Sequence, residues 1–161
     1  MSDAPAVVFD CNVFLQALAS PDGPAGRCVA FAFEGKAKLF ISTHVLNEIR
    51  EVASSAIVIR KLRIRPDRLD ALIENLPKAA VLIPVVAEVW TYDRDPDDAH
   101  YVNLALAARA SLVVSRDRDL LDLMDISKPH AAEFQRRFPS LKILDPLQFL
   151  GEMGERRQAS S

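Results

Sequence analysis

The sequence predicts a single α/β domain built around a parallel sheet, and three observations lead to this fold class. Its 161 residues, half of them hydrophobic, suffice for one compact domain with its own core. Most of its short β-type runs are apolar throughout rather than alternating, which is typical of parallel strands covered on both faces. Segments with helical periodicity separate these runs along the chain. We therefore expect a three-layer α/β/α sandwich with a parallel sheet of about five strands.

The strands are expected at the runs AVVF, LFIS, AVLI, LVVS and LKIL, which are Ala6–Phe9, Leu39–Ser42, Ala80–Ile83, Leu112–Ser115 and Leu141–Leu144. Helices are expected between and after them, at Ala25–Glu34, Thr43–Ala53, Pro66–Leu76, Asp97–Ala110, Leu120–Met124 and about Pro146–Met153. Pro66 suits the first turn of a helix, where its missing N–H costs little. The final residues have no apolar face, so we expect one domain over residues 1–151 and a disordered tail over residues 152–161.

Composition limits the class of function. Acidic residues exceed basic ones by 22 to 20, and this balance predicts no general attraction to nucleic acid or to an anionic membrane. Carboxylates that hold a divalent ion reverse that sign locally, so a nucleic-acid substrate stays open. Cys11 and Cys28 have neither the number nor the spacing of a disulfide framework or a zinc site. With no signal-peptide pattern and no apolar stretch near the ~20 residues that span a bilayer, we expect a cytoplasmic protein without membrane contact.

Acidic residues are expected to gather at the carboxyl end of the sheet, where parallel α/β folds bind ligands. Asp10 ends the first strand, and Asp117 and Asp119 follow the fourth. Asp98 stands near a helix start, on the face that points toward the sheet. Each of these acids is also compatible with an ordinary capping or first-turn role.

Glu48 is the most informative single acid, because it lies beside an apolar helical stripe formed by Val45, Ile49 and Val52. A carboxylate there needs a partner or a metal to offset its desolvation. An ion pair with a basic residue such as Arg50 is the structural alternative.

Converging carboxylates cannot all stay ionised without a cation, since like charges raise each other's pKa. Oxygen ligands of this kind suit Mg²⁺ or Mn²⁺, as one or two ions. The reaction that follows most naturally is metal-assisted hydrolysis of a phosphodiester.

These motifs resemble those of the PIN-domain ribonucleases, a family common among toxins of VapBC-like bacterial toxin–antitoxin pairs, over about Val7 to Leu150. The family ends its first strand with an Asp-Thr/Ser-Asn pattern, matched here by Asp10-Cys11-Asn12. Its helical Glu is matched by Glu48, and the Asp that opens a later helix by Asp98. Its Thr-Gly-Asp-x-Asp-Leu-Leu is matched by the run Ser115 to Leu121.

The resemblance implies the sheet order 3-2-1-4-5 and a metal-dependent endoribonuclease. Its implied catalytic residues are Asp10, Glu48, Asp98 and Asp117, which with Asp119 would also bind the metal. Asn12 and Ser115 would orient these ligands or water. Two departures are Cys11, where a hydroxyl residue is usual, and Arg116, where glycine is usual. Arg116 would either block a phosphate or bind it.

Several features concern partners. Candidate RNA contacts are Arg116 and the basic run Arg60, Lys61 and Arg63. A basic run of this kind is more often a helix face exposed to solvent. The family resemblance also implies an antitoxin protein and a homodimer as partners. His44, His100 and His130 show no ligand spacing, and we expect none of them to bind a metal.

Other functions fit less well. A haloacid-dehalogenase-type phosphatase needs Asp-x-Asp after its first strand, but position 12 is Asn. A receiver domain needs an Asp after its third strand, where this chain has Pro84. The remaining alternative is a catalytically degenerate PIN domain that binds RNA or protein without cutting.

Overall fold

One parallel sheet organises the protein, in a computed structural model that describes residues 4–159. Its strands are β1 (Ala6–Phe9), β2 (Lys38–Ser42), β3 (Val81–Ile83), β4 (Leu112–Val114) and β5 (Lys142–Leu144). Their order is β3-β2-β1-β4-β5, and every neighbouring pair is parallel. The predicted fold class and strand order are therefore confirmed.

The helices occupy the connections between strands. They are α1 (Cys11–Ala19), α2 (Pro24–Phe33), α3 (Thr43–Ala53), α4 (Ala56–Lys61), α5 (Pro66–Ala79), η1 (Pro96–Asp98), α6 (Ala99–Ala108), α7 (Arg118–Leu121), η2 (Asp122–Met124), α8 (Ala131–Arg137) and α9 (Pro146–Ala159). Three of them, α1, α4 and α8, lie outside the helix ranges predicted above. Helix α1 starts directly after β1 without a connecting loop, because Asp10 caps it through a hydrogen bond from the N–H of Val13.

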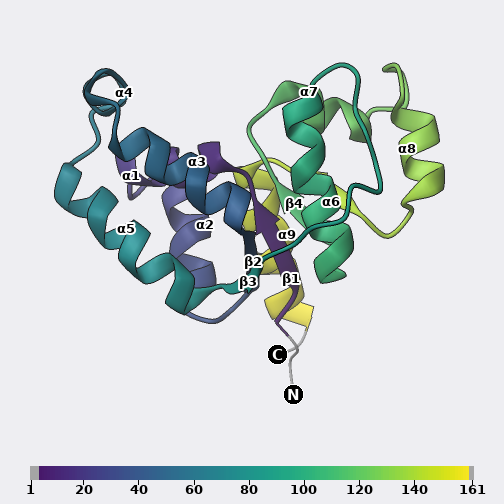
Figure 1. The fold of residues 1–161 in the computed structure, drawn as a ribbon. Helices are drawn as coiled ribbons and strands as arrows, with labels where there is room; N and C mark the ends of the chain where they lie inside the picture. Colours follow the sequence, from purple (N-terminus) through teal and green to yellow (C-terminus); the bar gives the residue numbers. More distant parts are fainter. Residues whose placement is uncertain (1–3, 160–161) are drawn as a thin grey trace.

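Helices cover both faces of the sheet (Figure 1). Helix α6 contacts β1, β2 and β4 on one face. On the other side lie α1, α2, α3 and α5 (Figure 1), and α9 packs against α2. There the ring of Phe149 lies edge-on to those of Phe9 and Phe31, with centroids 5.7 and 5.9 Å apart. This arrangement buries all of β4 and all of β1 except Ala6, and leaves their carboxyl ends to form a site.

Helix α9 continues to Ala159, through most of the segment for which the sequence predicts a disordered tail. Met153 is only 2 % exposed and belongs to the core. A side chain beyond residue 151 therefore packs in the core of the domain. The sequence did not predict this contact because the segment lacks a continuous apolar stripe. Residues 160 and 161 lie outside the described part.

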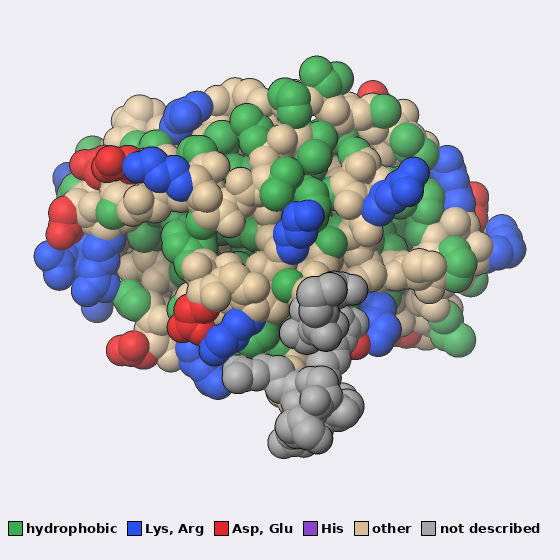
Figure 2. Space-filling view, turned by 90° about the horizontal axis from the view of Figure 1, so that it is seen from below, with side chains coloured by type: hydrophobic (Ala, Val, Ile, Leu, Met, Phe, Trp, Pro, Cys, Tyr) green, Lys and Arg blue, Asp and Glu red, His purple; other side chains and the backbone are tan. Residues whose placement is uncertain are grey.

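Among residues 4–159, no helix has both the length and the apolar character needed to cross a membrane. The face that carries the chain termini shows Lys, Arg, Asp and Glu side chains in small separate groups with hydrophobic side chains between them (Figure 2). The acidic residues predicted to form a site lie at the opposite, carboxyl end of the strands.

Candidate functional site

Asp10 stands where β1 and β4 end side by side. Its N–H donates to the carbonyl of Val114 at 3.0 Å, extending the strand pairing by one residue. Its Oδ1 accepts from the N–H of Val13 at 3.0 Å, and its Oδ2 accepts a short hydrogen bond from Oγ of Ser115. Ser115 is fully buried and also accepts from the N–H of Asp117 at 2.9 Å. Ser115 therefore connects Asp10 to the loop that carries the second acid.

The environment of Asp10 makes its ionisation less favourable in the absence of a cation. Burial raises the pKa of Asp10 to about 6, and the nearby charge of Asp117 acts in the same direction. Hydrogen bonds from Ser115, Val13 and the backbone of Arg116 oppose that rise. A nearby cation would offset the desolvation and the repulsion together.

Four aspartates meet beside Asp10. One carboxylate oxygen from each of Asp95, Asp98, Asp117 and Asp119 lies within 4.8 Å of the others. Asp95 and Asp98 lie just before and at the end of η1, which leads into α6, and Asp117 and Asp119 are the N-cap and a first-turn residue of α7, after β4. Because these segments are held by the sheet and by α6, the folded chain itself brings the acids together.

Asp98 is the member of this cluster that most clearly lacks a partner. It is 7 % exposed, and its Oδ2 is fully buried without a hydrogen bond among the described residues. Burial, together with Asp117 and Asp95, raises the pKa of Asp98 to about 8. A buried, unpaired carboxylate oxygen among three other carboxylates is a donor set that suits a hard divalent cation.

Asp119 differs from the other three because the chain supplies its counter-ion. Nε of Arg94 lies 2.5 Å from Oδ1 of Asp119, and Nη2 of Arg94 lies 2.9 Å from Oδ2 of Asp122. The hydroxyl of Tyr92 donates to the backbone carbonyl of Asp119 at 2.8 Å. Asp119 thus lies in the acidic cluster that the sequence predicts, but its charge is shared with a guanidinium.

Glu48 lies in a second, adjacent group of side chains. Its Oε1 accepts from the hydroxyl of Tyr101 at 2.8 Å, and that hydroxyl accepts from the N–H of Cys11 at 3.0 Å. Nε2 of His100 and Nε2 of His44 lie 3.3 and 3.8 Å from the same oxygen. Burial alone would raise the pKa of Glu48, but His100, Tyr101 and His44 together lower it. The ion pair with Arg50 considered from the sequence is replaced by these contacts.

Two residues that depart from the family pattern have defined surroundings. Burial raises the pKa of the Cys11 thiol to about 12, so it remains protonated at neutral pH. Arg116 is exposed, and residues with positive φ in the described chain are Arg63, Arg109, His130 and Gly35, not Arg116. The arginine therefore needs none of the backbone freedom that glycine provides.

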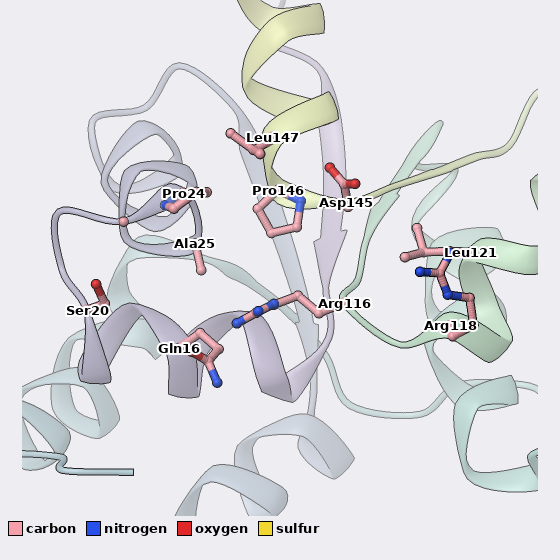
Figure 3. A pocket seen from close by; sticks show the side chains of 11 residues that line it. Gln16, Ser20, Pro24, Ala25, Arg116, Arg118, Leu121, Asp145, Pro146 and Leu147 are labelled. Atoms are coloured by element: carbon pink, nitrogen blue, oxygen red, sulfur yellow. The ribbon is translucent and has the colours of Figure 1, made fainter.

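A cavity of about 470 Å³ is lined in part by Arg116 and Arg118, the residues on either side of Asp117 in the sequence (Figure 3). Arg116 extends across it toward Gln16 of α1, while Arg118 lies on its other side (Figure 3). Pro24 and Pro146, the first residues of α2 and α9, complete this lining. Side chains of the β4–α7 loop thus alternate, with Ser115 and Asp117 toward the acids and the two arginines toward this cavity.

The other predicted residues are on the surface. Asn12 is exposed in the first turn of α1, one residue after Cys11. Arg60, Lys61 and Arg63 are exposed at and just beyond the end of α4, on the α3 and α5 side of the molecule (Figure 1).

Sequence reasoning missed several residues of this edge: Arg94, Asp95, Tyr101, His44 and His100. One of them had a visible signal, since His44 precedes Glu48 by four residues and so shares its helical face. Arg94 and Asp95 lie in a loop without periodicity, and only the fold places them against Asp119 and Asp98.

Comparisons with known proteins agree with this geometry. The family model described as the PIN domain matches residues 6–119, which is more than two thirds of the chain. The chain belongs to the PIN domain family. A relative, the uncharacterized protein MJ1680 of Methanocaldococcus jannaschii, is 30% identical over 122 residues, covering 76% of this chain and 77% of its own.

A solved structure shares the fold of this PIN domain. It is VapBC2 from Rickettsia felis bound to a DNA fragment from its promoter, matched with a TM-score of 0.53 and 12% identity. The match covers 87% of this chain and 98% of that one. At this identity the likeness shows the fold alone.

Proposed function

We propose that this PIN-domain protein is a metal-dependent endoribonuclease and the toxin of a type II toxin–antitoxin pair. The observation that carries the catalytic part is Asp98, whose buried Oδ2 has no hydrogen-bond partner in the described chain and lies among three other aspartates. Such an arrangement is costly unless a cation is bound.

Asp10, Asp98 and Asp117 would hold Mg²⁺ or Mn²⁺, with Glu48 and Asp119 at the margins of the site. A bound ion would activate water and neutralise the charge that develops on phosphorus. Ser115 fixes the carboxylate of Asp10 through its hydrogen bond and so sets the direction of its free lone pairs.

Asp119 requires a further step before it can serve as a ligand, because Arg94 holds its Oδ1 at 2.5 Å. Either the ion displaces this guanidinium, or Asp119 holds Arg94 next to the site. In the second case Arg94 would be available to pair with a phosphate of the substrate.

RNA contacts are proposed at Arg116, whose guanidinium spans the cavity beside the acids (Figure 3). Planar guanidinium groups bind phosphate through paired hydrogen bonds. Asn12, exposed at the start of α1, is placed to contact water or substrate, and Arg60, Lys61 and Arg63 offer a second, more distant basic surface.

The toxin part of the proposal rests on the PIN family and on the shared fold with a VapBC complex. It implies an antitoxin protein as partner and allows a homodimer. Co-expression with the product of a short neighbouring reading frame, followed by co-purification, tests the antitoxin. Mass measurement by light scattering tests the dimer.

A binding module without cleavage is the second candidate. The observation that favours it is the Arg94–Asp119 ion pair, which neutralises one acid of the cluster internally. In that case the protein would bind a divalent ion or RNA without hydrolysing the phosphodiester.

The deciding experiment is cleavage of a mixed RNA pool by the purified full chain with Mg²⁺ or Mn²⁺, and with chelator. Asp10→Asn and Asp117→Asn test the acids. Asp67→Asn is the matched control, because Asp67 is exposed and pairs with Arg65 at the start of α5, away from the acids of the site. Cleavage that requires the metal, Asp10 and Asp117 but not Asp67 supports the nuclease; folded protein that binds metal and cuts no RNA supports the binding module.

A further inference from the structure

Two histidines that the sequence did not mark as ligands lie next to Glu48. His44 precedes Glu48 by one helical turn in α3, and His100 comes from the first turn of α6. One ligand atom from each of the three side chains lies within 4.8 Å of the others. Two separate helices thus bring two imidazoles and one carboxylate to one point.

The spacing of these atoms matches that of ligands around a metal ion. Nε2 of His100 and Nε2 of His44 lie 3.3 and 3.8 Å from Oε1 of Glu48. For metal–ligand bonds of about 2.0–2.2 Å, tetrahedral geometry requires ligand atoms about 3.3–3.6 Å apart. The two distances to Glu48 lie within a few tenths of an ångström of that range, and all three ligand atoms lie within 4.8 Å of one another.

The ring of His100 gives an independent indication of a missing partner. Both of its ring nitrogens are fully buried, and neither makes a hydrogen bond of good geometry with the described residues. Nε2 has Oε1 of Glu48 at 3.3 Å as an ion-pair neighbour, so the interaction of this nitrogen with its partner is not that of a well-formed hydrogen bond. A metal ion on Nε2 would satisfy one of the two nitrogens.

The group is separate from the aspartate cluster and can be reached from solvent. Tyr101 binds the same Oε1 of Glu48 and lies between Glu48 and the backbone of Cys11, next to Asp10. A cavity of about 370 Å³ is lined by His44 and His100 together with the exposed Glu88. An ion could enter there, and a water or an external ligand could complete its coordination.

We propose that His44, Glu48 and His100 form a second metal site, which takes a first-row transition ion of the Zn²⁺ class. Imidazole nitrogen suits Zn²⁺, Co²⁺ and Ni²⁺, whereas the all-oxygen aspartate cluster suits Mg²⁺ or Mn²⁺. The two groups would therefore select different ions at one edge of the sheet. The site shares Glu48 with the proposed nuclease site, but binding of an ion by the two histidines and Glu48 does not require that the chain cut RNA.

The probe is Co²⁺, whose visible absorption reports imidazole-containing coordination, added to the chelator-treated full chain and then displaced by Zn²⁺. His44→Ala removes one ligand, and it should fold because the side chain of His44 is 57% exposed. His100→Ala tests the second ligand. His130→Asn, at an exposed position outside the group, is the matched control, and the Asp98→Asn/Asp117→Asn double variant disables the aspartate cluster.

We expect the wild type, His130→Asn and the double aspartate variant to show the same Co²⁺ spectrum and affinity. His44→Ala and His100→Ala should each bind Co²⁺ at least about tenfold more weakly, with circular dichroism confirming their fold. Absence of Co²⁺ binding by the wild type would overturn the proposal, as would equal binding by folded His44→Ala. Loss of the spectrum in the double aspartate variant would assign the ion to the aspartates instead. Because no step uses RNA, failure here leaves the nuclease proposal untouched.

Discussion

Replacing Tyr101 by phenylalanine removes one hydroxyl that joins two parts of the site. That hydroxyl accepts from the N–H of Cys11 at 3.0 Å and donates to Oε1 of Glu48 at 2.8 Å. The ring is 5 % exposed and would stay in place, since phenylalanine fills nearly the same space. The substitution therefore tests the two hydrogen bonds rather than the packing.

The expected loss follows from what each partner does next. The N–H of Cys11 would be left buried and unpaired, which costs about 1–3 kcal/mol. Glu48 is about one third exposed, so water can replace most of its lost bond. We expect a loss of about 2 kcal/mol in the free energy of unfolding, or about 4–8 °C in Tm for a chain of this size.

Urea and thermal unfolding of the metal-free protein measure this loss. Tyr92→Phe is the matched control, because Tyr92 is also buried and its hydroxyl donates to the backbone carbonyl of Asp119, while the nearby Arg94 keeps its ion pairs with Asp119 and Asp122 when that hydroxyl is removed. Its loss should be about 1 kcal/mol, since the carbonyl keeps a second lone pair for other donors. The proposed link through this hydroxyl is refuted if the free energy of unfolding of Tyr101→Phe lies within about 0.5 kcal/mol of the wild-type value, or if Tyr101→Phe loses no more stability than Tyr92→Phe.

Three further outcomes are expected. The pKa of Asp98 is about 8 in the folded protein and 3.8 in the unfolded chain, so the folded metal-free protein binds one more proton between these pH values and its stability falls as the pH rises. Asp98→Asn should remove this dependence of stability on pH. Urea unfolding should therefore show a larger gain in stability over the wild type at pH 8 than at pH 5. Mn²⁺ should raise the wild-type Tm more at pH 8 than at pH 5, because the ion competes with protons for Asp98 and Asp10, and equal shifts at the two pH values would contradict this. Ser115→Ala should lower the free energy of unfolding by about 2–4 kcal/mol, since it removes the hydrogen bond to Asp10 and leaves the N–H of Asp117 without its acceptor. A loss under about 1 kcal/mol in denaturant unfolding would argue against Ser115 as the link between the acids.

Much of the sheet could be predicted because its signal is local. A strand covered on both faces must be apolar at every position, and Leu112–Val114 is buried throughout. Helix α1 was not predicted, because it follows β1 directly and Asp10 is both its N-cap and a site residue. No loop separates the strand from the helix in the sequence. Helix α8 is short, and the residue before it, His130, has a positive φ that the residue type alone does not predict.

The site was predictable only in part, for a related reason. The sequence places Asp10, Asp98 and Asp117 at strand or helix ends, and these positions follow from element boundaries. The partners of each acid come from segments distant in the chain. Glu48 meets Tyr101 across 53 residues, and Arg94 reaches Asp119 from an irregular loop. Such pairings depend on how loops lie over the sheet, which periodicity does not encode.

The alternation of side chains after β4 has a consequence for how this protein can change. Ser115 and Asp117 face the acids, whereas Arg116 and Arg118 face the neighbouring cavity (Figure 3). Substitutions at positions 116 and 118 can therefore alter what is held beside the acids while the acids keep their places. Under the proposed function, the residues that would meet the substrate could thus be exchanged independently of the acids that would hold the metal.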